Sequence, residues 1–285
     1  MNPDRNPLLD QSALNALNTS ACAGQHDPLE RELQHAIGNG ELFLEFQPIV
    51  RLSTARMVGA EALVRWRHPT RGVVMPNDFI PYAERNGLIG LIGEFVLEQT
   101  CALLRECQHP DRGPLVLSLN VSAPQLMDGD FVRVVARCLG EYQIEPACLR
   151  LEITETASFE DPATAVTQLR ALKQLGVSIV LDDFGTGYSS LSRLMRLEVD
   201  GLKVDGSFAR AVPHDEKAVK ILECIARLAS VLDLSLLVEG VESKAQADWL
   251  RRLGDVQIQG YFFSRPVSLT TLRAAIGSGS GALPV

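Results

Sequence analysis

Short apolar runs alternate along this chain with longer segments in which apolar residues recur at helical spacing. Runs of the first kind predict strands and segments of the second kind predict helices. The pattern predicts eight strands, at residues 42–50, 57–66, 115–121, 149–153, 178–182, 201–204, 234–238 and 256–262. It also predicts helices at residues 29–37, 79–84, 93–105, 131–142, 163–175, 188–195, 217–232, 244–253 and 269–276.

The spacing of these elements favours an α/β barrel. Only a short turn, residues 51–56, separates the first two strands, so they should pair antiparallel. Segments of helix length separate the later strands, as in βα units around a parallel sheet. We therefore predict a TIM-type (β/α)8 barrel variant with an antiparallel first strand over residues 28–276, between flexible ends at 1–27 and 277–285. An open, doubly wound sheet is the alternative.

Charge and hydropathy exclude some classes of protein. The formal net charge of −8 argues against binding of polymeric nucleic acid, which requires a basic surface. No apolar run of signal-peptide length follows Met1, so we expect a cytoplasmic protein. The most apolar stretch, residues 221–238, contains Glu223, Arg227 and Asp233, so no membrane span is expected.

The cysteines and histidines provide no evidence for a zinc site. The six cysteines form no C-x-x-C pair, which is typical of reduced thiols. The five histidines are scattered and lie outside the acidic motifs described next.

Polar residues recur at the ends of the predicted strands. They are Glu61, Asn120, Glu152 with Glu155 beyond it, Asp182, Asp183, Lys203, Glu239 with Glu242 beyond it, and Gln259. In a TIM barrel the carboxyl ends of the strands meet at one mouth. One such carboxylate is easily explained as a helix cap, but a ring of them would repel unless cations neutralise it.

An oxygen-only set of ligands suits Mg²⁺ or Mn²⁺, and the adjacent Asp182 and Asp183 could reach two ions. Two ions that activate water and stabilise a leaving oxygen are typical of phosphodiester cleavage. Lys203 could orient or deprotonate the water, or shield charge in the transition state. The loop at residues 183–187 has two glycines and could approach a ligand closely.

Eight short motifs follow one another in order along the chain. They are Phe46-Gln47-Pro48-Ile49-Val50, Glu61-Ala62-Leu63-Val64-Arg65, Asn120-Val121-Ser122, Glu152-Ile153-Thr154-Glu155, Asp182-Asp183-Phe184-Gly185-Thr186-Gly187, Leu202-Lys203-Val204-Asp205, Glu239-Gly240-Val241-Glu242 and Gln259-Gly260-Tyr261. Together these motifs resemble the EAL domain family, and the resemblance extends from about Leu29 to Pro266. It implies a variant TIM barrel that hydrolyses cyclic di-GMP to linear pGpG with Mg²⁺ or Mn²⁺.

The resemblance also implies a role for each residue. Metal would be bound by Glu61, Asn120, Glu152, Asp182 and Glu239, with Asp183 on a second ion. Lys203 would contact the catalytic water, Gln259 would help to position it, and Glu155 would steady the loop at 183–187. Substrate would be bound by Gln47, Leu63 and Arg65, with Arg65 on a phosphate. A homodimer is implied as well. Gly206 departs from the family pattern, which commonly has a larger residue there.

Three other functions remain open. A receptor that binds cyclic di-GMP without cleaving it would be expected to lack some motif residues, and we find no gap. A Mg²⁺-dependent barrel enzyme could act on a non-nucleotide substrate, because this fold hosts many chemistries. An interaction protein could use the barrel surface, and variants of the lysine and metal ligands would separate that role from catalysis.

Overall fold

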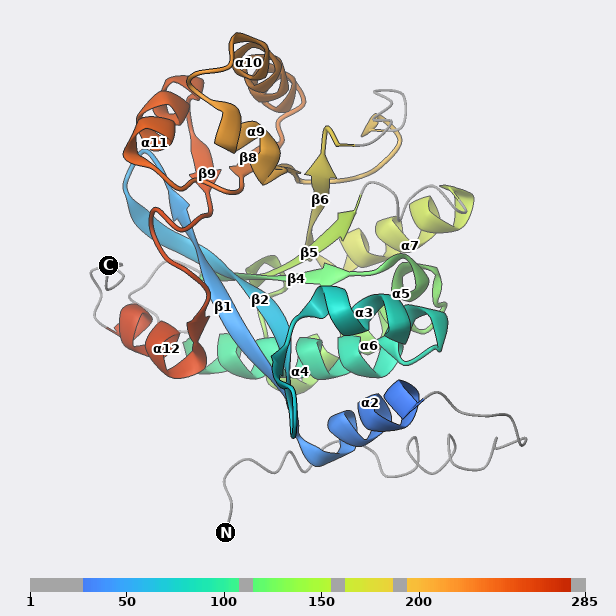
Figure 1. The fold of residues 1–285 in the computed structure, drawn as a ribbon. Helices are drawn as coiled ribbons and strands as arrows, with labels where there is room; N and C mark the ends of the chain where they lie inside the picture. Colours follow the sequence, from blue (N-terminus) through green and yellow to red (C-terminus); the bar gives the residue numbers. More distant parts are fainter. Residues whose placement is uncertain (1–27, 108–114, 155–161, 187–193, 278–285) are drawn as a thin grey trace.

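A closed barrel of eight strands forms the centre of the molecule in the computed structural model, which describes residues 28–107, 115–154, 162–186 and 194–277 (Figure 1). The strands of the barrel are β1 (Leu42–Arg51), β2 (Arg56–His68), β4 (Val116–Val121), β5 (Leu149–Thr154), β6 (Ser178–Phe184), β7 (Gly201–Val204), β8 (Ser235–Val238) and β9 (Val256–Ile258). β1 pairs antiparallel with both β2 and β9, and the other neighbours in the barrel are parallel. The predicted TIM-type barrel with an antiparallel first strand is confirmed.

Helices cover the outside of this barrel (Figure 1). The α-helices of the described chain are α2 (Pro28–Asn39), α3 (Pro76–Arg85), α4 (Ile89–Cys107), α5 (Ala123–Met127), α6 (Phe131–Tyr142), α7 (Pro162–Leu175), α9 (Gly206–Ala211), α10 (Glu216–Val231), α11 (Lys244–Leu250) and α12 (Leu269–Gly277). None of the described helices is long and apolar enough to cross a membrane.

The strands present alternate residues to two different environments. On β5, Leu149, Leu151 and Ile153 join the apolar core under the helices. Arg150 and Glu152 point the other way, because they bond to Gln257 on β9 and Lys203 on β7, strands that do not pair with β5. The interior of the barrel is therefore partly polar, and the strand period of two decides which residues reach it.

The β1–β2 hairpin is longer than the barrel requires and extends beyond it (Figure 1). Its register places Gln47 opposite Glu61 and Glu45 opposite Leu63. Since alternate residues share a face of a strand, Glu61, Leu63 and Arg65 lie along one face of β2. The hairpin thus forms a shelf that leads away from the barrel mouth.

Several predicted boundaries are wrong. The eighth strand ends at Ile258 and not at 262, because the chain then bonds to a neighbouring loop: Val241 N donates to Gln259 O and Phe262 N to Val241 O. The short elements α5, α9, β3 (Gly72–Val74) and β10 (Val267–Ser268) were not predicted, since they carry too few periodic positions. Most of the helix predicted at 188–195, the extension at 1–27 and most of the tail at 277–285 lie outside the described residues.

Candidate functional site

The predicted ring of polar residues is assembled at the barrel mouth. Glu61, Asn120, Glu152, Asp182 and Lys203 lie on β2, β4, β5, β6 and β7, while Glu239 and Gln259 directly follow β8 and β9. The parallel register places Asn120 beside Glu152, and Thr154 beside Asp182. These seven polar residues, each from a different strand or the residue after it, therefore come together although up to 198 residues separate their sequence positions.

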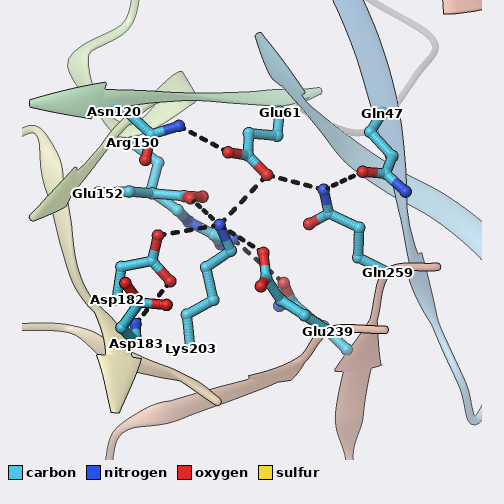
Figure 2. Close-up of polar contacts among 11 residues, drawn as sticks. Gln47, Glu61, Asn120, Arg150, Glu152, Asp182, Asp183, Lys203, Glu239 and Gln259 are labelled. Atoms are coloured by element: carbon cyan, nitrogen blue, oxygen red, sulfur yellow. Dashed lines mark hydrogen bonds and ion pairs between the residues drawn. The ribbon is translucent and has the colours of Figure 1, made fainter. Parts of the chain in front are cut away.

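The ammonium group of Lys203 lies at the centre of four carboxylates (Figure 2). Its Nζ is 2.5 Å from Glu152 Oε2 and 2.7 Å from Glu239 Oε1. It is 3.2 Å from both Glu61 Oε2 and Asp182 Oδ2. The lysine itself is only 1% exposed. One positive and four negative groups give this cluster a formal charge of −3 when all are ionised.

The pKa values of the cluster reflect this imbalance. Burial raises the pKa of Glu152 to about 8 and that of Glu239 to about 7, despite the attraction of Lys203. Burial also raises the pKa of Asp182. For Lys203, burial acts to lower the pKa, but the carboxylates outweigh it and leave the pKa well above its ordinary value. Lys203 is thus protonated at neutral pH. Its single positive charge is too little to neutralise the four surrounding carboxylates.

Amide side chains hold Glu61 from two sides. Asn120 Nδ2 donates to Glu61 Oε1 at 2.6 Å, and Gln259 Nε2 donates to Glu61 Oε2 at 2.7 Å. Gln259 Nε2 also donates to Gln47 Oε1 at 3.0 Å. Burial raises the pKa of Glu61, but Lys203 and these amides outweigh it and leave the pKa below its ordinary value. Glu61 is therefore the carboxylate of the cluster most firmly kept as an anion.

Asp182 and Asp183 follow one another but face different environments. The side chain of Asp182 is buried in the cluster, and its Oδ1 accepts a hydrogen bond of 2.8 Å from the backbone N–H of Asp183. Asp183 is exposed and has a positive φ of 55°. The left-handed turn directs the second carboxylate out of the barrel strand, at the edge of the same mouth.

The cluster offers unused oxygen atoms for a cation. Among the described residues, Glu152 Oε1 and Gln259 Oε1 are buried without a hydrogen-bond partner, which is uncommon for buried polar groups. As these side chains stand, no described group of three or more His, Cys, Asp and Glu is arranged to bind a metal ion. The donor set of carboxylate and amide oxygens nevertheless fits Mg²⁺ or Mn²⁺, and the excess negative charge favours such an ion.

The predicted substrate-binding residues lie beside the cluster on the β1–β2 shelf. Gln47 touches Gln259 directly. Leu63 is half-buried, and the Arg65 side chain is buried with its Nε donating to Glu45 Oε2 at 2.8 Å. Arg65 Nη1 also donates to the backbone oxygen of Val64 at 2.9 Å. These contacts fix the guanidinium on the shelf.

Sequence reasoning missed two charged residues of this region. Glu45, the partner of Arg65, lies on the same face of the hairpin as Gln47, and the strand period could have indicated it. Arg150 is buried inside the barrel, two residues before Glu152, and its Nη1 donates to Gln257 Oε1 at 3.3 Å. The same period of two could have identified Arg150 as an interior cation. Glu155, by contrast, lies outside the described residues.

Known proteins resemble this chain over most of its length. The family model for the EAL domain matches residues 30–266. The bifunctional diguanylate cyclase/cyclic di-GMP phosphodiesterase MucR of Pseudomonas aeruginosa is 37% identical over 90% of this chain and 38% of its own length. The cyclic di-GMP phosphodiesterase NbdA of the same species is 39% identical over 88% of this chain and 32% of its own length.

Solved structures resemble the chain in the same way. The PaMucR phosphodiesterase in its c-di-GMP complex superposes with a TM-score of 0.81 at 38% identity, over 86% of this chain and 99% of that one. The chain thus spans well under half the length of MucR and NbdA, but nearly the whole of this solved domain. The chain belongs to the EAL domain family.

Proposed function

We propose that this domain hydrolyses cyclic di-GMP to linear pGpG in a reaction that depends on divalent metal ions. The observation that carries the proposal is the convergence of four carboxylates on one buried lysine at the barrel mouth. Relatives that match this chain over most of its length are named as cyclic di-GMP phosphodiesterases, and one matches it in complex with c-di-GMP.

The residues proposed to hold two ions, Mg²⁺ or Mn²⁺, are Glu61, Asn120, Glu152, Asp182 and Glu239, with Asp183 on the second ion. The free Glu152 Oε1 and the excess of negative charge support this assignment. When bound, such ions activate water and stabilise charge on the phosphoryl and leaving oxygens.

Lys203 acts as a donor in this proposal and not as a base. Its pKa is well above the ordinary value, so its ammonium keeps its proton at neutral pH. An ammonium at the centre of the ring can orient the attacking water and stabilise the anionic transition state. Gln259, fixed between Glu61 and Gln47, would position the same water through its free Oε1.

The shelf formed by β1 and β2 is the proposed groove for the substrate. Arg65 would donate to a phosphate oxygen, and Leu63 and Gln47 would line the path from Arg65 to the carboxylates. The fixed guanidinium of Arg65 supports this role, because a donor that is already oriented loses little freedom on binding.

The family resemblance also supports a homodimer, a loop-steadying role for Glu155 and a cytoplasmic location, which we propose with it. Sedimentation at several protein concentrations, with and without cyclic di-GMP, tests the dimer. A monomer at every concentration would contradict it.

The test of the reaction is chromatography of the products formed from cyclic di-GMP with Mg²⁺ or Mn²⁺. Formation of pGpG that requires metal and is lost in Glu61→Gln supports the proposal. Glu216→Gln, which changes an exposed glutamate on α10, is the control and should be as active as the wild type. Tight binding without cleavage under every metal would instead favour a silent cyclic di-GMP receptor, and neither binding nor cleavage would contradict the substrate.

A further inference from the structure

A separate pocket adjoins the carboxylate cluster at the barrel mouth. Its volume is about 210 Å³, and its polar and aromatic lining comes from Gln47, Arg210, Glu239, Glu242, Gln259 and Tyr261. Glu239 and Gln259 belong to both the pocket and the cluster. The pocket is smaller than the roughly 300–1,000 Å³ typical of sites for whole drug-sized ligands, so it suits one ring system of a larger substrate.

Arg210 reaches this pocket because of a glycine one helical turn earlier. Gly206 and Arg210 are four residues apart in α9, so they share a face of the helix. A Cβ atom at position 206 would lie 3.1 Å from Arg210 Nη1 and 3.2 Å from the Cα of Gly240. The guanidinium therefore lies across Gly206 and beside Gly240, which also lines the pocket.

The lining of the pocket matches the edges of a guanine base. Guanine has two adjacent acceptors, O6 and N7, which a guanidinium can contact with two parallel hydrogen bonds. Its N1–H and N2–H₂ groups are donors that suit the carboxylates of Glu239 or Glu242. Tyr261 is 52% exposed and adds a flat aromatic face, with the Arg265 guanidinium 4.3 Å from its ring centre. Base stacking on such rings is a common contribution to nucleotide binding.

A phosphate is a poorer occupant of this pocket. Glu239 and Glu242 would both repel it, and Arg210 is the one cation among the residues that line the pocket. A neutral base can accept hydrogen bonds from Arg210 and donate hydrogen bonds to Glu239 or Glu242 at the same time.

We propose that Arg210 is a specificity-determining residue that recognises a guanine of cyclic di-GMP through O6 and N7. This inference rests on the proposed function and deepens it. Adenine carries an N6–H₂ donor where guanine carries O6, so the guanidinium would face a donor and the contact would be lost. Arg210 and Glu239 line the same pocket, and this places the recognised base next to the proposed reaction centre.

The test compares the wild type with Arg210→Met, Arg210→Lys and the control Arg227→Met, which changes an exposed arginine on α10. Dissociation constants for cyclic di-GMP and cyclic di-AMP are measured with Ca²⁺, and KM and kcat with Mg²⁺. Arg210→Met should weaken cyclic di-GMP binding and raise KM about 5- to 100-fold, the range for one bidentate contact to a base, with kcat within about threefold. Arg210→Lys should be intermediate, and Arg227→Met should match the wild type.

The two nucleotides separate a base contact from a phosphate contact. The inference predicts that the preference for cyclic di-GMP over cyclic di-AMP falls in Arg210→Met by the same factor as the affinity. An equal loss for both nucleotides, or no loss, would overturn it. If the wild type binds cyclic di-GMP without cleaving it, the proposed hydrolysis is contradicted, but the dissociation constants still test the role of Arg210. If the wild type does not bind cyclic di-GMP, both the proposed function and the inference about Arg210 are overturned.

Discussion

Lys203 Nζ lies 2.5 Å from Glu152 Oε2, and both side chains are almost completely buried. The pair alone would be balanced, but Glu61, Asp182 and Glu239 surround the same ammonium. Removal of one partner from a buried ionic group costs about 3–5 kcal/mol, because the other charge stays behind uncompensated. We therefore expect the stability of the domain to depend on the positive charge available to these four carboxylates.

Replacement of the lysine should weaken the metal-free protein. Lys203→Met should lower the free energy of unfolding by about 3 kcal/mol in EDTA, and Mg²⁺ should stabilise the variant more than the wild type. The same variant should lose roughly 10²- to 10⁴-fold in kcat, since the proposed donor to the water is gone. Thermal unfolding and product formation measure the two effects.

The matched control for this lysine is Lys220→Met. Lys220 is exposed and, among the residues that the structure describes, pairs with Glu216 alone, one turn away, so its loss should change stability by no more than about 0.5 kcal/mol. Equal effects of the two substitutions would contradict the central role of Lys203.

The pH dependence of stability should reflect Glu152. Its pKa is raised from 4.5 to about 8 in the folded state, so the folded protein keeps a proton that the unfolded chain releases. Stability is therefore lost as the pH rises from about 4.5 to 8, by on the order of 1 kcal/mol per pH unit at most. Glu152→Gln should flatten this slope in EDTA, as should Mg²⁺ added to the wild type. If the stability of wild type and Glu152→Gln fell equally with rising pH, that result would argue against a raised pKa of Glu152.

In the ion pair between Arg65 and Glu45, we expect Arg65 to bind the substrate and Glu45 only to anchor Arg65. Arg65→Gln should raise KM for cyclic di-GMP at least about tenfold, because the proposed phosphate contact is lost. Glu45→Gln keeps an acceptor for Arg65 Nε and should change KM less than about threefold. Steady-state kinetics of the two variants decide this, and a larger effect of Glu45→Gln would show that Arg65 does not itself bind the substrate.

Gly260 allows the chain to turn sharply behind Gln259. A Cβ atom there would lie 2.2 Å from Val241 O and 2.4 Å from Val241 N, both backbone atoms that cannot move aside easily. Gly260→Ala should destabilise the domain by about 2 kcal/mol or more and should lower kcat through displacement of Gln259. Denaturant unfolding and kinetics measure both.

The comparison for this glycine is Gly90→Ala in α4, where an added Cβ meets nothing within 4 Å. That substitution should stabilise the domain by about 0.5–1 kcal/mol, because alanine favours the helix more than glycine does. A similar loss of stability in both variants would refute the account of the turn at Gly260.

The sequence predicted the barrel because each strand carries its own signal. Strands such as 201–204 are apolar runs bounded by turns, and the polar residue at each carboxyl end marks the mouth. Once the fold is a barrel, Glu61, Glu152 and Lys203 must meet, although they are far apart in the chain. The predicted set of mouth residues followed from this geometry, and the EAL motifs then assigned a role to each.

Other features depend on contacts that no local pattern contains. The pairing of Arg65 with Glu45 follows from the register of β1 and β2, and the path of Arg210 depends on the space left between Gly206 and Gly240. The early end of β9 results from hydrogen bonds between its extension and the loop at Val241. Each of these is set by packing between segments distant in sequence, which periodicity cannot detect.

The central claim is that the ring around Lys203 binds two divalent ions for phosphodiester hydrolysis. The most direct measurement is the anomalous diffraction of Mn²⁺ in crystals grown with that ion and cyclic di-GMP. We predict two Mn²⁺ peaks, held by residues among Glu61, Asn120, Glu152, Asp182, Asp183 and Glu239, next to a nucleotide phosphate. A single peak would contradict the two-ion centre. A nucleotide-bound ring without Mn²⁺, in which Lys203 kept all four carboxylates, would contradict the metal-dependent account as a whole.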